Sequence, residues 1–150
     1  MSINNQNPPL TETLAVLSSV ALLADVDFFP ALDRMSGKLS LYSRILEGFT
    51  LDLIERRAAL DTLGNEGDLG LLRIAVHSIK GGASMVGLRS LPVQAGIAEM
   101  QILKWSAQLQ PPPTSHMISE IIVPVLRDMD TAIASLPSLH GRMLSVIGSA

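Results

Sequence analysis

The sequence has no cysteine among its 150 residues, and only 3% of them are aromatic. The absence of cysteine excludes disulfides, thiolate metal sites and a catalytic thiol. With so few aromatic rings, the core must be built from Leu, Ile, Val, Ala and Met, which mostly favour helices. The length suggests one domain, and such a chain can bury a hydrophobic core without cross-links.

Basic residues and long apolar runs are scarce as well. The formal net charge is −3, which gives a nucleic-acid-binding role no electrostatic support. The most apolar early run, residues 14–24, is too short to cross a bilayer, and no Lys or Arg precedes it as in a secretory signal. We therefore expect a soluble, cytoplasmic protein that binds neither nucleic acid nor membrane.

Helical periodicity dominates the sequence after a polar start, residues 1–10, which we expect to be a flexible tail. No convincing alternating strand is present. Apolar spacing and end signals predict helices at residues 11–24, about 38–63, from 66 or 68 to 86, from 90 to the Pro-rich segment 110–115, and about 115–136, with a short helical piece between Pro30 and Gly37.

Particular residues mark the predicted helix ends. Thr11 and Ser90 are suitable N-caps, and residues 64–68, GNEGD, are a turn signal. Gly87 is placed as a left-handed residue that ends a helix. Pro124 should kink the last helix, after which residues 137–150 are assigned to a C-terminal tail.

Several long amphipathic helices with short joins predict an all-α protein. The expected architecture is an antiparallel four-helix bundle over residues 11–136, with an additional N-terminal helix.

The helical wheel of residues 68–86 places His77 opposite the apolar stripe that holds Leu72, Ile79 and Val86. An exposed imidazole is therefore expected. Arg73 and Lys80 lie about one turn away, within side-chain reach of the ring.

These neighbours suit nucleophilic chemistry, because neutral imidazole is a nucleophile and nearby positive charges disfavour its protonation. The charges of Arg73 and Lys80 would also stabilise an anion on the ring, and a phosphoryl group is the obvious candidate. Ser84, on the same face, could add a hydrogen bond.

Two adjacent glycines follow His77, at a cost of about 2 kcal/mol to a helix interior. Gly81 lies on the face of His77, where any side chain would crowd the ring, so glycine leaves an approach for a bulky partner. Gly82 points toward the core and would let another helix pack closely. Ile74 and Met85 are candidates for the surrounding partner surface, with residues of the preceding helix.

His77, Lys80, Gly81, Ser84 and Gly87 together resemble the signature of the histidine-containing phosphotransfer (HPt) domain. A second similar segment spans residues 26–49, and the resemblance covers residues 26–135. It implies a four-helix bundle in which His77 carries a phosphoryl group, through its distal nitrogen, to and from receiver-domain aspartates. Lys80 and Arg73 would be electrostatic supports.

The resemblance also implies the partners: receiver domains of response regulators and a sensor or hybrid histidine kinase. No P-loop or kinase ATP-binding module is present, so the chain would be a phosphotransfer intermediate rather than an ATP-using enzyme. It would need no cofactor or metal, since the Mg²⁺ that assists transfer would belong to the receiver.

Three alternatives share parts of this pattern. A helical adaptor that binds receiver or kinase domains without being phosphorylated would have the same fold. An enzyme could use His77 as a general base, but no carboxylate lies on the same face of its helix. A metal protein could use His77, His116 and His140, although their spacing matches no ligand motif.

Overall fold

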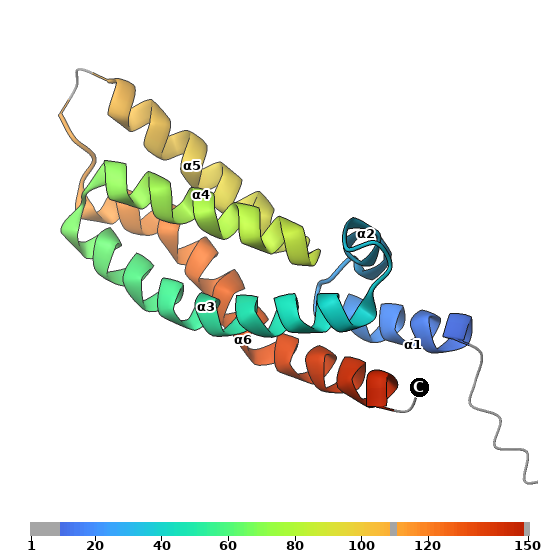
Figure 1. Ribbon diagram of the computed structural model, residues 1–150. Coiled ribbons are helices and arrows are strands. Elements are labelled where there is room, and N and C mark those ends of the chain that lie inside the picture. The colour runs from blue at the N-terminus through green and yellow to red at the C-terminus, as the bar shows by residue number, and fades with distance from the viewer. Residues whose placement is uncertain (1–9, 109–110, 149–150) are drawn as a thin grey trace, which may run out of the picture.

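The computed structural model of the chain describes residues 10–108 and 111–148. Within these ranges the regular structure is entirely helical (Figure 1). The helices are α1 (Leu10–Leu23), α2 (Phe28–Arg34), α3 (Leu39–Glu66), α4 (Leu69–Val86), α5 (Ser90–Ala107) and α6 (Ser115–Gly148). Of the expected flexible tail, residues 1–9 lie outside the described part of the chain, and Leu10 belongs to α1.

The four long helices form a closed bundle (Figure 1). α3 packs against α4 and α6, and α5 packs against the same two helices, so that each long helix borders two others. The prediction of an all-α four-helix bundle is confirmed. The additional N-terminal helix is α1, which packs against α2 and α6.

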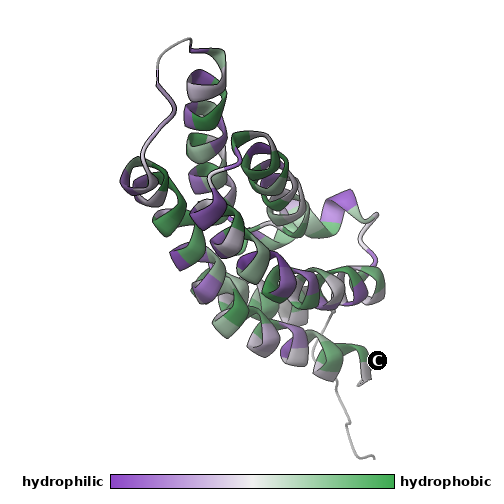
Figure 2. Ribbon diagram, turned by 90° about the vertical axis from the view of Figure 1, so that its left-hand side faces the viewer, coloured by the Kyte–Doolittle hydropathy of each residue, from purple (hydrophilic) through white to green (hydrophobic). Residues whose placement is uncertain are grey.

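Aliphatic side chains build the core, as the scarcity of aromatic residues requires. Hydrophobic and hydrophilic residues alternate along the helices, the pattern of amphipathic helices (Figure 2). The buried set includes Leu46, Leu53, Val76, Ile102 and Met129, one or more from each helix of the bundle. The bundle is therefore held mainly by burial of apolar side chains between its four helices.

The C-terminal segment departs from the prediction. α6 does not end at residue 136, and the assigned C-terminal tail is helical up to Gly148 with Pro124 and Pro137 inside the helix. Proline in a helix interior costs about 3 kcal/mol, but continuing the helix buries Leu139 and Met143, each contributing about 1.5–3 kcal/mol. The free energy gained by burying Leu139 and Met143 thus exceeds the cost of Pro137 within the helix. The extension of α6 beyond residue 136 lies beside α1 (Figure 1).

Several other helix ends also differ from expectation, among them those of α2, which spans Phe28–Arg34 instead of the expected piece between Pro30 and Gly37. α1 begins at Leu10, so Thr11 is not its N-cap, and Ser90 is the first residue of α5 rather than the cap before it. The expected turn at 64–68 is shorter than predicted, because α3 continues to Glu66 and ends at left-handed Gly67. Each difference moves an end by one to three residues and leaves the order of the helices unchanged.

The end of the histidine-bearing helix α4 at left-handed Gly87 is as predicted. Gly87 has a φ of +91°, and the Leu88 N–H donates to the Ala83 carbonyl. The Asp27 N–H donates to the Gly87 carbonyl, so closely that a Cβ on residue 87 would lie 2.7 Å from the Asp27 oxygen. Glycine is therefore required here by both conformation and space.

None of the helices within residues 10–108 and 111–148 is long and apolar enough to cross a membrane.

Candidate functional site

α4 has a clear beginning and one buried face. The Asp68 side chain caps its N-terminus by accepting a hydrogen bond from the Leu71 N–H at 3.1 Å. The buried residues are spaced four and three apart, which turns one stripe of the helix toward the core: Leu72, Val76, Ile79, Ala83 and Val86. The opposite stripe faces solvent.

His77 lies on that solvent-facing stripe. Its side chain is 66% exposed, which confirms the exposed imidazole that the helical wheel predicts. A ring that remains this accessible can be reached by a second protein without any opening of the bundle.

A carboxylate from the neighbouring helix meets the imidazole. Glu99 of α5 places Oε2 2.9 Å from His77 Nδ1, and the Glu99 side chain is only 15% exposed. Burial raises the pKa of this carboxyl, but the hydrogen bond from His77 and the positive charge of Lys80 outweigh burial, and the pKa lies below its usual range. Glu99 is therefore ionised at neutral pH.

Lys80 completes a three-residue cluster with His77 and Glu99. Its Nζ lies 3.5 Å from each Glu99 carboxylate oxygen, and its side chain is 37% exposed. The stem of Lys80 runs past Gly96 of α5, where a Cβ would lie 3.6 Å from Lys80 Cδ. Thus the cation expected beside His77 is held at the α4–α5 seam by the same carboxylate that contacts the ring.

The other two polar residues named from the sequence are less closely tied to the ring. Arg73 is exposed one turn before His77 and makes no hydrogen bond or ion pair with the described residues, so its side chain is available to an incoming group. Ser84 shares the face of His77, but seven residues of helical rise separate them by about 10 Å along the axis. Its carbonyl accepts a hydrogen bond from Arg34 at 2.7 Å.

The two glycines differ in their surroundings. A Cβ on Gly82 would lie 3.1 Å from the Phe49 ring, which confirms that Gly82 allows α3 to pack closely. A Cβ on Gly81 would meet no atom within 4 Å, so a methyl group there would not crowd the imidazole as expected. The space at Gly81 is open toward solvent beside His77.

Exposed apolar side chains occur on both helices that carry the cluster. Ile74 and Met85, named from the sequence, are exposed on α4. Sequence reasoning missed a second set on α5, although its helical spacing was visible as a stripe opposite the buried one: Val93, Ile97, Met100 and Leu103. Both helices that carry the site therefore expose apolar side chains as well as charged ones.

Glu99 is the functional candidate that sequence reasoning missed. The one available signal was a lone carboxylate in the otherwise uncharged run from residue 90 to 103. Nothing local to α5 indicated that this carboxylate faces His77, since that depends on how α4 and α5 align.

The remaining histidines lie elsewhere, on α6. His116 Nε2 is 3.0 Å from Glu120 Oε1, and His140 Nε2 is 3.7 Å from Glu47 Oε2. Each histidine thus pairs with a different carboxylate. No cluster of three potential metal ligands occurs among the described side chains.

The four-helix bundle with His77 exposed on α4 agrees with the fold and site that the resemblance to a phosphotransfer domain implies. The model of the Hpt domain family matches residues 44–135, more than half of the chain, and this protein belongs to that family. The match includes His77, Lys80, Gly81 and Glu99 and confirms the resemblance, although it begins after most of the segment 26–49. No curated protein and no solved structure gives a significant match.

Proposed function

We infer that the chain acts as a phosphotransfer carrier in a phosphorelay, a general role that its membership of the Hpt family supports. We propose that His77 is the residue that carries the phosphoryl group, accepting it from the aspartyl phosphate of one receiver domain and passing it to the aspartate of another. The observation that carries this proposal is the 66% exposed imidazole on the face of α4 opposite the core.

The contacts of the ring support transfer through Nε2. Nδ1 is occupied by Glu99 at 2.9 Å, so Nε2 is the nitrogen left for an incoming group. A phosphoryl group on Nε2 would bring close to two negative charges to this surface. Arg73 and Lys80 flank His77 on the same helix and would stabilise those charges.

The surrounding surface supports a transient protein partner. Ile74 and Met85 expose apolar area on the same helix as His77, and Gly81 leaves room for a second backbone to approach. A receiver domain docked here would bring its own Mg²⁺ and acidic cluster, which Arg73 and Lys80 complement in charge. The donor at the start of the relay would be a sensor or hybrid histidine kinase, so the chain would itself use no ATP.

The test is incubation of the protein with phosphorylated receiver domains, followed by detection of acid-labile, base-stable phosphate. Wild type should become labelled, and His77→Gln should remain unlabelled because the amide is not a nucleophile. His116→Gln is the matched control, since His116 is also an exposed histidine beside a carboxylate, and it should label like wild type. A labelled His77→Gln variant would refute the assignment. An adaptor would bind receivers without any label and would be unaffected by His77→Gln.

A further inference from the structure

The start of α3 and the end of α6 lie side by side and enclose a cavity that contains no residue of the candidate site (Figure 1). Its volume is about 600 Å³, whereas three other cavities in the described part of the chain measure about 180, 200 and 110 Å³. Small-molecule sites in proteins usually have volumes of about 300–1,000 Å³. A small ligand would therefore fit between the two helices.

The walls of this cavity are mainly apolar. Four aliphatic residues line it, two from each helix: Leu39, Leu41, Val146 and Ile147. All four are only half-buried in the protein alone. Contact with an alkyl chain would remove more of their apolar surface from water, which favours binding.

Two cations border the apolar walls. Lys38 and Arg44 are each three residues from Leu41, so the leucine lies between them at the start of α3. Both cations are exposed, and neither side chain makes an ion pair or a hydrogen bond with a described residue. Their charges are therefore available to a ligand in the cavity.

The segments that form the cavity contain no opposing carboxylate. Residues 34–46 and 131–150 have no Asp or Glu, although the whole chain has a formal net charge of −3. Glu47, which follows the first segment, lies 3.7 Å from His140. The cavity thus combines apolar walls with a positive rim, and an anion that carries an alkyl chain complements both.

We propose that this cavity binds a single-chain amphipathic carboxylate of the fatty-acid type. The carboxylate lies between Lys38 and Arg44, and the alkyl chain runs along the apolar walls. Seven residues line the cavity, whereas a stable protein interface uses about 20–30 residues on each side, so a small ligand matches it better than a protein partner. The site is separate from His77 and does not depend on the proposed role of His77 as phosphoryl carrier.

The first test is titration of the ¹⁵N-labelled wild-type protein with decanoate, followed by nuclear magnetic resonance of the backbone amides. For a ligand of this size we expect a dissociation constant of about 0.1–1 mM. The largest shift changes should fall at residues 38–44 and 146–147. Acetate has only the carboxylate and decanol only the chain, so each should bind about tenfold more weakly. Shift changes centred elsewhere, or acetate or decanol binding as tightly as decanoate, would overturn the proposal.

Neutral variants of the two cations test the positive rim. Arg44→Gln and Lys38→Gln should each weaken decanoate binding about three- to tenfold, because each removes a charged partner of the carboxylate. Arg56→Gln is the matched control, since Arg56 also lies on α3 but pairs with Asp52 and does not line the cavity. It should bind decanoate like wild type. An equal loss in Arg56→Gln would show that only the net charge of the protein matters, against a site at Lys38 and Arg44.

A polar substitution tests the wall that α6 contributes. Ile147→Asn should weaken decanoate binding about three- to tenfold through lost apolar contact. Leu144→Asn is its control, because Leu144 is exposed near the same end of α6 without lining the cavity, and it should bind like wild type. Unchanged binding in folded Ile147→Asn would contradict the placement of the alkyl chain.

Other occupants of the cavity would give different results. A second copy of the chain would appear as a dimer in sedimentation that Ile147→Asn dissociates, and this would overturn the proposal. Binding to phosphatidylglycerol vesicles without binding of free decanoate would indicate a membrane contact and would overturn it as well. His77→Gln should bind decanoate like wild type, so the ligand site and the carrier role can fail independently.

Discussion

Gly81 illustrates a conflict between folding and function in a single residue. Glycine in a helix interior costs about 1 kcal/mol relative to alanine, and nothing within 4 Å of a Cβ there requires its absence. The reason for glycine must therefore lie outside the isolated chain. A second protein that approaches His77 from this side would meet any side chain at position 81.

We accordingly expect Gly81→Ala to stabilise the fold and to impair transfer. The free energy of unfolding should rise by about 1 kcal/mol, which thermal unfolding measures as an increase of about 2–4 °C in Tm. The rate of transfer from a phosphorylated receiver should fall, because the methyl group occupies space that the partner needs.

Gly141 offers the matched control for this experiment. It lies within α6, and a Cβ there also meets no atom within 4 Å. Gly141→Ala should give the same gain in Tm without affecting transfer. Equal transfer rates for Gly81→Ala and Gly141→Ala would mean that the open space at Gly81 is not used by a partner.

The residues of the site differ in how far the sequence could predict them. The exposure of His77 followed from the periodicity of α4 alone, because helical geometry fixes the face of each residue. The contact with Glu99 could not be predicted in this way. It depends on the register between α4 and α5, which is set by packing across the seam and leaves no periodic signal in either helix.

The ends of the helices show a similar division between local and tertiary causes. Gly87 was predictable as a left-handed terminus since a positive φ is a local requirement that glycine meets. The extension of α6 past Pro137 was not, because it depends on Leu139 and Met143 packing into the core against distant elements. A proline therefore does not predict the end of a helix when the buried apolar face of that helix continues beyond it.

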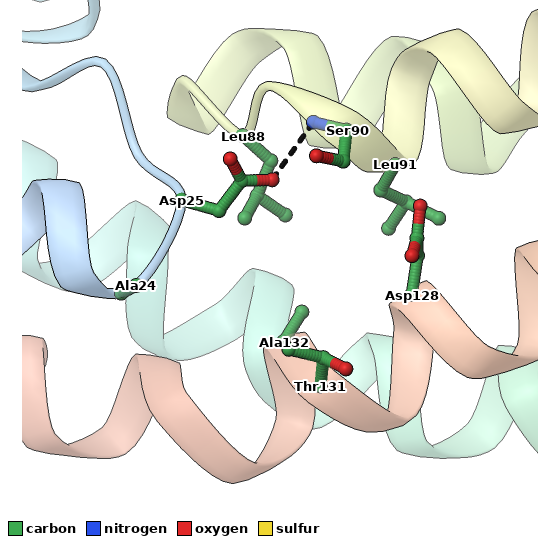
Figure 3. A pocket seen from close by; sticks show the side chains of 8 residues that line it. All are labelled: Ala24, Asp25, Leu88, Ser90, Leu91, Asp128, Thr131 and Ala132. Atoms are coloured by element: carbon green, nitrogen blue, oxygen red, sulfur yellow. Dashed lines mark hydrogen bonds between the residues drawn. The ribbon is translucent and has the colours of Figure 1, made fainter.

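A polar junction forms where the end of α1, the α4–α5 turn and α6 meet (Figure 3). Asp25 and Asp128 line a cavity of about 180 Å³ there. Asp25 accepts a hydrogen bond from the Ser90 N–H at 2.8 Å, but one carboxylate oxygen of Asp128 is buried without a partner among the described residues. Burial and the nearby Asp25 charge raise the pKa of Asp128 above its usual range, while Arg127 opposes this.

The raised pKa of Asp128 makes the stability of the junction depend on pH. Because the folded state favours the protonated carboxyl, stability should decrease as pH rises from the ordinary aspartate range through the raised pKa. Asp128→Asn has no charge to bury beside Asp25, so it should stabilise the protein at neutral pH by about 1 kcal/mol. Denaturant unfolding of both proteins across the acidic and neutral range should show this difference shrink as pH falls. A difference that stays constant with pH would show that ionisation of Asp128 is not its cause.

The candidate site on α4 lies apart from the end of the molecule that is formed by α1 and the last part of α6. α4 carries His77 and packs against α2, α3 and α5 but not against α6. α1 and the extension of α6 beyond residue 135 lie outside the part of the chain that the family model matches. We therefore expect α1 and the extension of α6 to contribute stability, while the residues that act in phosphotransfer lie within residues 44–135.

Met143 allows that division to be tested, because its side chain is fully buried within the extension of α6. Met143→Ala should lower the free energy of unfolding by about 2–5 kcal/mol, through lost burial and the cavity left behind, and denaturant unfolding measures this. The neighbouring Leu144 is exposed, so Leu144→Ala should have little effect on stability and serves as the control. Below the unfolding transition, both variants should accept phosphate at the wild-type rate per folded molecule. Slow transfer in folded Met143→Ala would instead indicate that the packing of α1 against α6 reaches the surface around His77.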